Sequence, residues 1–304
     1  MTAHPPILPG IAELAESYDA YIVDLWGVVH NGHAPLPGVV DALYRLRDRG
    51  AVVCLLSNAP RRAQTVVARL RDIGIPDDAY DAIVTSGEAT HQALAERPDT
   101  FHQTLGRHCF HIGPSRDRDL YEGLDITIVA DADQASFVLN SGIDQPDETL
   151  ADYESHLTAA LNRDLPMICA NPDLVVMIGD LRSLCAGTFA MWYEERGGRV
   201  AYHGKPHRPV YQRCLDLIRA CQSNGGSDAD ARQPRVLAVG DSVRTDIAGA
   251  RLAGLDSLLV TGAGIHTDAL ACDASGWPSQ DALRALLSDY PVAPNYVAPY
   301  LNWA

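Results

Sequence analysis

The run Tyr21-Ile22-Val23-Asp24-Leu25-Trp26-Gly27-Val28 decides the fold class, because β-branched and aromatic residues end in an aspartate and then reach a turn-forming glycine. Apolar runs of this kind, rich in Val, Ile and Leu, recur along the chain between stretches with helical spacing. This alternation is typical of a parallel sheet that is buried on both faces. The sequence therefore predicts the α/β class.

Polar residues follow each of the first three predicted strands. The strands are expected at residues 21–24, 51–56 and 82–84, with helices between them at about 39–50 and 61–72. Ligands of open α/β sheets bind at the carboxyl ends of the strands. The residues expected at those ends are Asp24, Ser57-Asn58 and Thr85-Ser86-Gly87.

The chain is expected to form two domains, one inserted into the other. A fresh set of strand-like runs and helical stretches begins near Glu88 and continues to about Asn171. The first pattern then resumes, with helices at about 186–196, 209–220 and 246–253 and strands at 199–202 and 236–239. We therefore predict a parallel-sheet core of residues 1–88 and 171–304 and an inserted α/β domain of residues 89–170, with a surface loop at 222–234.

Composition narrows the class of partner. The 304 residues contain 24 Lys+Arg and 39 Asp+Glu, which gives a formal charge of 24 − 39 = −15. Such a chain offers no basic surface for nucleic acid or for an anionic membrane. Seven scattered cysteines without a C-x-x-C pair, together with no signal-peptide pattern and no run of 18 apolar residues, predict a reduced, unexported, cytoplasmic protein.

Five residues at predicted strand ends have side chains suited to one chemistry. They are Asp24, Ser57, Lys205, Asp241 and Asp246. Alone, Lys205 would be read as a surface charge and Thr245-Asp246 as a helix N-cap. If the runs before them are neighbouring parallel strands, however, these side chains converge in one crevice.

Clustered carboxylates require a cation, because like charges raise one another's pKa. An all-oxygen ligand set favours Mg²⁺ over zinc. The same ion would neutralise a phosphoryl group, whose oxygens Ser57 and Lys205 could bind. The residues thus point to phosphoryl transfer with Asp24 as the nucleophile.

Four segments of the chain resemble the motifs of a known family. Asp24 to Val28, Leu55 to Asn58, Gly204-Lys205-Pro206 and Gly240 to Asp246 are similar to the four ordered motifs of the haloacid dehalogenase superfamily of hydrolases. The segments Thr85-Ser86-Gly87 and Ala170-Asn171-Pro172-Asp173 resemble its subclass IIA, the nitrophenyl-phosphatase-like and sugar- or nucleotide-phosphatase-like branch. The resemblance covers about residues 18–265.

The resemblance implies a Rossmann-like core with an inserted cap domain and a phospho-aspartyl intermediate at Asp24. Mg²⁺ would be held by Asp24, the backbone carbonyl of Trp26 and Asp241, and Asp246 would orient these ligands. Ser57 and Lys205 would hold the transferring phosphoryl group, with Asn58 as a further substrate-binding residue. The implied substrate is a small phosphorylated metabolite, and homodimers occur in this subclass.

One position departs from the family pattern. Phosphatases of the family usually carry a second aspartate two residues after the nucleophile, as general acid and base, and Trp26 stands there in this chain. Loss of that group typically costs about 10²–10⁴ in rate. The substrate could have a good leaving group, or His30 on the same loop could replace the acid. The alternatives are a weakly active or inactive protein that senses a phosphometabolite, and a hydrolase of carbon–phosphorus or carbon–halogen bonds.

Overall fold

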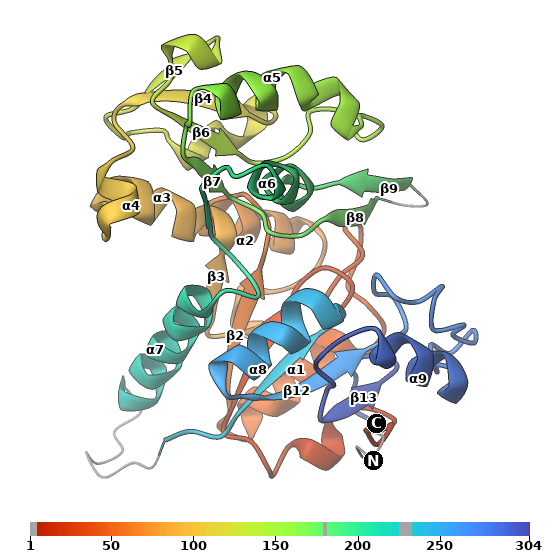
Figure 1. Ribbon diagram of the computed structural model, residues 1–304. Coiled ribbons are helices and arrows are strands. Elements are labelled where there is room, and N and C mark those ends of the chain that lie inside the picture. The colour runs from red at the N-terminus through yellow and green to blue at the C-terminus, as the bar shows by residue number, and fades with distance from the viewer. Residues whose placement is uncertain (1–4, 179–180, 225–232) are drawn as a thin grey trace. The chain divides into compact units, whose positions relative to one another are not determined.

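The computed structural model describes residues 5–178, 181–224 and 233–304, and these divide into two compact units. The first unit comprises the described residues up to Ser57, Val66–Val84 and Pro206–Ala304. The second comprises Asn58–Thr65 and Thr85–Lys205. Figure 1 shows the elements of both units along the chain. No helix among the described residues has the length and apolar character needed to cross a membrane.

The first unit contains a six-stranded sheet in the order β13-β12-β11-β1-β2-β3, and the strand pairs whose register is defined are all parallel. Its strands are β1 (Ala20–Asp24), β2 (Val52–Ser57), β3 (Ala82–Thr85), β11 (Val236–Gly240), β12 (Asp256–Val260) and β13 (Tyr296–Ala298). Its helices are α1 (Val39–Asp48), all but the first turn of α2 (Ala63–Asp72), α7 (Arg208–Asn224), α8 (Ala248–Ala253) and α9 (Gln280–Ser288). Every residue of β1, β2 and β11 is buried, as the continuous apolar runs predict.

The strand order creates a switch point beside β1. The chain proceeds from β1 to β2 and β3 on one side, and β11 then returns to pair with β1 on the other side. At such a point the connections on the two sides diverge and leave a crevice at the carboxyl ends of the two strands. Asp24 ends β1, and Asp241 directly follows β11.

The second unit contains a five-stranded parallel sheet in the order β10-β7-β6-β4-β5 and an antiparallel pair of strands, β8 and β9. These strands are β4 (His108–Ile112), β5 (Thr127–Val129), β6 (Phe137–Asn140), β7 (Met167–Cys169), β8 (Val175–Ile178), β9 (Leu181–Leu184) and β10 (Val200–Tyr202). The helices are α3 (Ser86–Glu96), α4 (Thr100–Gln103), α5 (Leu150–Asn162) and α6 (Ala186–Glu195). A capping box between Thr149 and Asp152 begins α5.

The strand before Lys205 differs from the expectation. The sequence assigned the run 199–202 to the core, as one of the strands whose ends would meet in one crevice, but β10 pairs in parallel with β7 of the second unit. The physical reason lies in packing, because Val200 and Tyr202 join α6 in the apolar cluster around Phe189 and Met167. The predicted insert, residues 89–170, falls inside the second unit, which extends to Lys205. Most of the predicted surface loop 222–234 lies outside the described residues.

Candidate active site

Three carboxylates meet at the switch point of the first sheet. One carboxylate oxygen each from Asp24, Asp241 and Asp246 lies within 4.8 Å of the others. All three residues are buried, with exposed fractions of 7%, 8% and 4%. Among the residues that the structure describes, this is the single group of three or more acidic, histidine or cysteine side chains close enough to share an ion.

Strand register and a glycine bring the three carboxylates together. Val23 lies opposite Val239 in the β1–β11 pair, so the next residues of the two strands lead into Asp24 and Asp241. A Cβ atom on Gly240 would lie 2.1 Å from Cγ of Asp246, and only glycine therefore lets that carboxylate approach the end of β11. The chain then forms a π-helical turn, Val243–Ile247, which takes in the first two residues of the helix predicted at about 246–253, and α8 begins at Ala248.

Backbone amides hold two of the carboxylates. The Ser242 N–H donates to Oδ2 of Asp246 over 3.1 Å, and the Ile265 N–H donates to Oδ2 of Asp241 over 2.8 Å. Next to Ile265, Nε2 of His266 accepts a 3.3 Å hydrogen bond from the Val243 N–H. Sequence reasoning missed Ile265 and His266. The sequence feature that could have indicated these two residues is Gly262-Ala263-Gly264, which marks a turn in the loop after β12, at the end of another strand.

The donor set fits a hard divalent cation. Three carboxylates held this close and away from solvent repel one another, and a bound cation relieves that repulsion. Oxygen-only ligands suit Mg²⁺, which commonly takes one or two carboxylates and keeps several waters. The buried cluster therefore has the oxygen ligands that Mg²⁺, the predicted metal, prefers.

The structure places the remaining predicted residues on two units. Ser57 ends β2, directly after Leu56, which lies opposite Asp24 in the β1–β2 pair. Asn58 and Lys205 belong to the second unit, and both are 3% exposed. The Lys205 N–H donates to Oδ1 of Asn58 over 2.7 Å, and Nδ2 of Asn58 donates to the Lys205 carbonyl over 3.2 Å.

Trp26 lies over its own loop. A Cβ atom on Gly32 would lie 2.5 Å from Cη2 of the indole, and the His30 ring meets the Trp26 ring edge-on with centroids 5.4 Å apart. The Gly32 N–H donates to Nδ1 of His30 over 3.0 Å. Trp26 thus forms part of a closed turn, and its indole carries no group that could act as an acid or base near neutral pH.

His30 is neutral at physiological pH. Burial, with a smaller contribution from the positive charge of Arg69, lowers the pKa of His30 to about 4. Because Nδ1 accepts from Gly32, the proton of the neutral ring lies on Nε2. A neutral imidazole releases that proton only at very high pH, so the environment of His30 argues against its replacing the missing acid.

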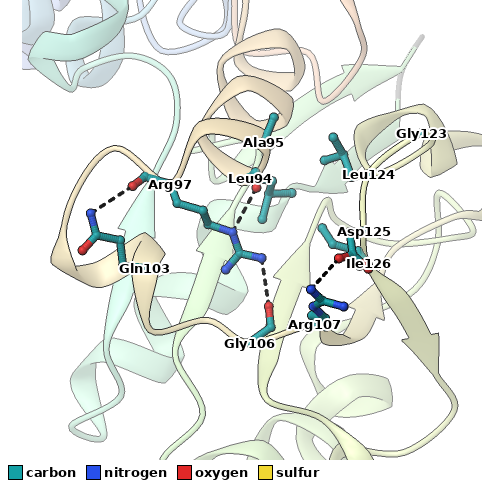
Figure 2. A pocket seen from close by; sticks show the side chains of 10 residues that line it. All are labelled: Leu94, Ala95, Arg97, Gln103, Gly106, Arg107, Gly123, Leu124, Asp125 and Ile126. Atoms are coloured by element: carbon teal, nitrogen blue, oxygen red, sulfur yellow. Dashed lines mark hydrogen bonds and ion pairs between the residues drawn. The ribbon is translucent and has the colours of Figure 1, made fainter.

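A separate hollow of about 450 Å³ lies in the second unit. Figure 2 shows that the cationic side chains around it are already paired within the protein. Arg97 donates to the carbonyls of Leu94, His102 and Gly106, and Arg107 forms an ion pair with Asp125 over 2.8 Å. The hollow therefore offers no assembled set of groups for a charged ligand.

Known proteins match both halves of the chain. Residues 21–127 match the family described as haloacid dehalogenase-like hydrolase, and residues 202–304 match a family described as HAD-hydrolase-like. A solved structure of a haloacid dehalogenase-like hydrolase from Brucella suis 1330 is 36% identical and covers 97% of this chain and 99% of its own, with a TM-score of 0.78.

Curated relatives are more distant. The 5'-nucleotidase YutF of Bacillus subtilis is 25% identical over 81% of this chain and 88% of its own length. The D-glycerol 3-phosphate phosphatase of Mycobacterium tuberculosis is 26% identical over 95% and 76%. A solved glycerol phosphate phosphatase from that organism, in complex with magnesium, shares the fold with a TM-score of 0.59, at 24% identity over 86% of this chain and 74% of its own.

These matches agree with the four motifs, the parallel sheet and the carboxylate cluster at its switch point. The 36% identity to the Brucella hydrolase extends over nearly the whole of both chains. The chain belongs to the haloacid dehalogenase-like hydrolase family, and within it to the subclass IIA that its motifs predicted.

Proposed function

We propose that the protein is a magnesium-dependent phosphohydrolase that acts on a small phosphorylated metabolite through a phospho-aspartyl intermediate at Asp24. The observation that carries this proposal is the buried cluster of Asp24, Asp241 and Asp246 at the carboxyl ends of β1 and β11. The two curated relatives act, by their names, on a nucleotide and on glycerol phosphate, which are both small phosphate monoesters.

Asp24, Asp241 and the backbone carbonyl of Trp26 would hold the ion, and Asp246 would orient them. When bound, Mg²⁺ supplies positive charge that offsets the charge of the phosphoryl oxygens. Within this arrangement a carboxylate oxygen of Asp24 attacks phosphorus, and the bond from phosphorus to the ester oxygen breaks. The Ser57 hydroxyl and the Lys205 ammonium bind the phosphoryl oxygens as the charge shifts.

Water completes the reaction by attacking the phosphorus of the aspartyl phosphate, which releases inorganic phosphate and restores the Asp24 carboxylate. Trp26 cannot protonate the leaving oxygen, so that oxygen must take its proton from solvent or leave as an anion. Leaving groups of low pKa, such as phenols, are therefore the expected good substrates. The predicted cap, residues 89–170, would supply the contacts that select the metabolite.

The test uses the intact chain and an aryl phosphate, with Mg²⁺ and with a chelator. We expect turnover only with Mg²⁺, and a loss of about 10³-fold or more for Asp24→Asn, because an amide is not a nucleophile at phosphorus. The proposal is wrong if the wild-type protein shows no turnover with Mg²⁺ or if Asp24→Asn retains the full rate.

A non-catalytic sensor of a phosphometabolite is the second candidate, and Trp26 in the acid position is the observation that favours it. Beryllium fluoride separates the two candidates. An active nucleophile forms a magnesium-dependent adduct at Asp24 and also turns over esters, whereas a sensor binds a phosphorylated ligand tightly without turnover. Release of halide or of a phosphonate-derived product would instead identify the carbon–halogen or carbon–phosphorus alternative.

A further inference from the structure

The side chain of Asn58 bonds to both backbone groups of one residue that is 147 positions away. Its Oδ1 accepts from the Lys205 N–H over 2.7 Å, and its Nδ2 donates to the Lys205 carbonyl over 3.2 Å. Both residues are buried within the second unit. One bond to the N–H and one to the carbonyl fix the direction of the backbone at Lys205 as well as its position, which a single bond would not do.

Asp173 fixes which way the amide of Asn58 faces. Nδ2 of Asn58 also donates to Oδ1 of Asp173 over 2.9 Å. A carboxylate can only accept, so the amide nitrogen must face Asp173 and the amide oxygen must face the Lys205 N–H. Asp173 is itself held in a turn, because its N–H donates to Oδ1 of Asn171 over 3.0 Å. Both hydrogens of the amide and one position on its oxygen are thereby used inside the protein.

The segment before Lys205 is shaped for this contact. Gly204 has a φ of +136°, and a Cβ atom there would lie 2.5 Å from Oδ1 of Asn58. Only glycine therefore allows the approach. On the other side, Nε2 of His203 lies 3.1 Å from Nε2 of His102, whose Nδ1 lies 2.7 Å from the Asp99 carboxylate. Contacts on both sides thus hold the residues that lead into Lys205.

We propose that Asn58, oriented by Asp173, is a positioning residue for Lys205 rather than a substrate ligand. Asn58 is joined by a peptide bond to Ser57, so its amide ties the chain that carries the predicted phosphate-binding hydroxyl to the backbone of the predicted phosphate-binding lysine. This inference rests on the proposed function, in which Ser57 and Lys205 bind the same phosphoryl group. Displacement by about 1 Å in such a site can cost about 10²-fold in rate.

Asn58→Asp tests the proposal with little change in shape. Its second oxygen would face the Lys205 carbonyl and the Asp173 carboxylate, so two donated bonds become two repulsive contacts. We expect kcat/KM for an aryl phosphate to fall by about 10–100-fold and the inhibition constant of inorganic phosphate to rise, because the lysine is displaced. The Mg²⁺ concentration for half-maximal rate should stay the same, since no carboxylate of the metal cluster is touched.

A double-mutant cycle shows whether Asn58 acts through the lysine. When Lys205 has already been replaced by Met, Asn58→Asp should lower kcat/KM for the aryl phosphate by less than about 3-fold, because the ammonium group that Asn58 positions is gone. A second pair is Asp173→Ala and Asp173→Asn. The asparagine keeps an oxygen for Nδ2 of Asn58, so it should recover most of the activity that the alanine loses. This pair also covers the case in which Asn58→Asp does not fold.

The outcomes separate this inference from the function on which it rests. A wild-type protein that hydrolyses no phosphate ester would overturn the proposed function. A wild-type protein that hydrolyses esters, while the effects of Asn58→Asp and Lys205→Met multiply, would overturn the inference alone. Equal loss of activity in Asp173→Asn and Asp173→Ala would also contradict it, as would a changed Mg²⁺ requirement in a folded Asn58→Asp variant.

Discussion

The backbone amide of Ile265 donates a 2.8 Å hydrogen bond to the carboxylate of Asp241, so the loop after β12 fixes a side chain that follows β11. Two glycines approach the same carboxylate. A Cβ atom would lie 2.6 Å from Oδ2 of Asp241 if added at Gly27 and 2.7 Å if added at Gly264. Asp241 is therefore enclosed by the loop after β1 and the loop after β12, which leaves little freedom for its orientation.

Gly27→Ala should displace Asp241, and Gly50→Ala provides a matched control. Both glycines have a φ of +80°, so alanine costs about 1–2 kcal/mol of backbone strain at either position. A Cβ atom at Gly50 meets nothing within 4 Å, whereas one at Gly27 meets the carboxylate. We expect both variants to lose thermal stability, Gly27→Ala more than Gly50→Ala because its Cβ atom would also lie 3.0 Å from Cα of Gly264, and only Gly27→Ala to lose kcat/KM, by about 10²-fold.

Metal binding measured without substrate tests whether Gly27→Ala loses activity because Asp241 is displaced. Titration with Mn²⁺, followed by electron paramagnetic resonance, should show weaker binding for Gly27→Ala and wild-type binding for Gly50→Ala. Equal activity of the two variants would mean that Asp241 can move aside without cost, and would argue against its role as a metal ligand.

Trp26→Asp should restore an acid and base, and Trp26→Asn separates that effect from the loss of the indole. Both variants remove the ring that lies over Gly32, so they share any change in loop packing. Only the aspartate can protonate a leaving oxygen, which is worth about 10²–10⁴ in rate for poor leaving groups. The ratio of the hydrolysis rate of Trp26→Asp to that of Trp26→Asn should therefore be large for alkyl phosphates and small for aryl phosphates. An equal ratio for both ester classes would show that no general acid is missing.

The sequence predicted the core strands well because their residues are buried on both faces. Strands buried on both faces need a continuous apolar run, and β1, β2 and β11 each have one. The same pattern could not assign β10 to a sheet. Three half-buried residues, Val200 to Tyr202, fit either sheet, and only packing with α6 and pairing with β7 decide.

For the candidate site, the sequence predicted the carboxylates but not the contacts that orient them. Carboxylates at strand ends are visible in one sequence, and the structure brings the predicted three together. The partners that orient them are not visible, because the Ile265 N–H is a backbone group and any residue carries one. The two-sided contact of Asn58 with Lys205 spans 147 positions and follows only from the folded path of the chain.

His30→Asn should leave hydrolysis nearly unchanged at neutral pH. The pKa of His30 lies near 4, so the ring carries no charge to lose, and Oδ1 of asparagine can accept the Gly32 N–H in place of Nδ1. His30→Leu removes that acceptor and should destabilise the loop by about 1–3 kcal/mol. The measurement is the rate against pH for both variants with an alkyl phosphate. If His30→Asn lost about 10²-fold or more, selectively for this poor leaving group, His30 would be the missing acid after all.

Acidification should weaken the protein partly through His111, which lies on β4 with Nε2 3.0 Å from the Ser141 hydroxyl. Burial lowers the pKa of His111 from 6.5 to about 4. Between these values the unfolded chain binds a proton that the folded chain does not, so the free energy of unfolding falls as pH drops from about 6.5 to 4, by at most about 3 kcal/mol. His111→Gln keeps a polar group for Ser141 but cannot titrate. Its urea midpoint should therefore fall less steeply than that of the wild type over this range, while other titrating groups affect both proteins alike. Parallel curves would show that His111 can be protonated within the fold at no cost.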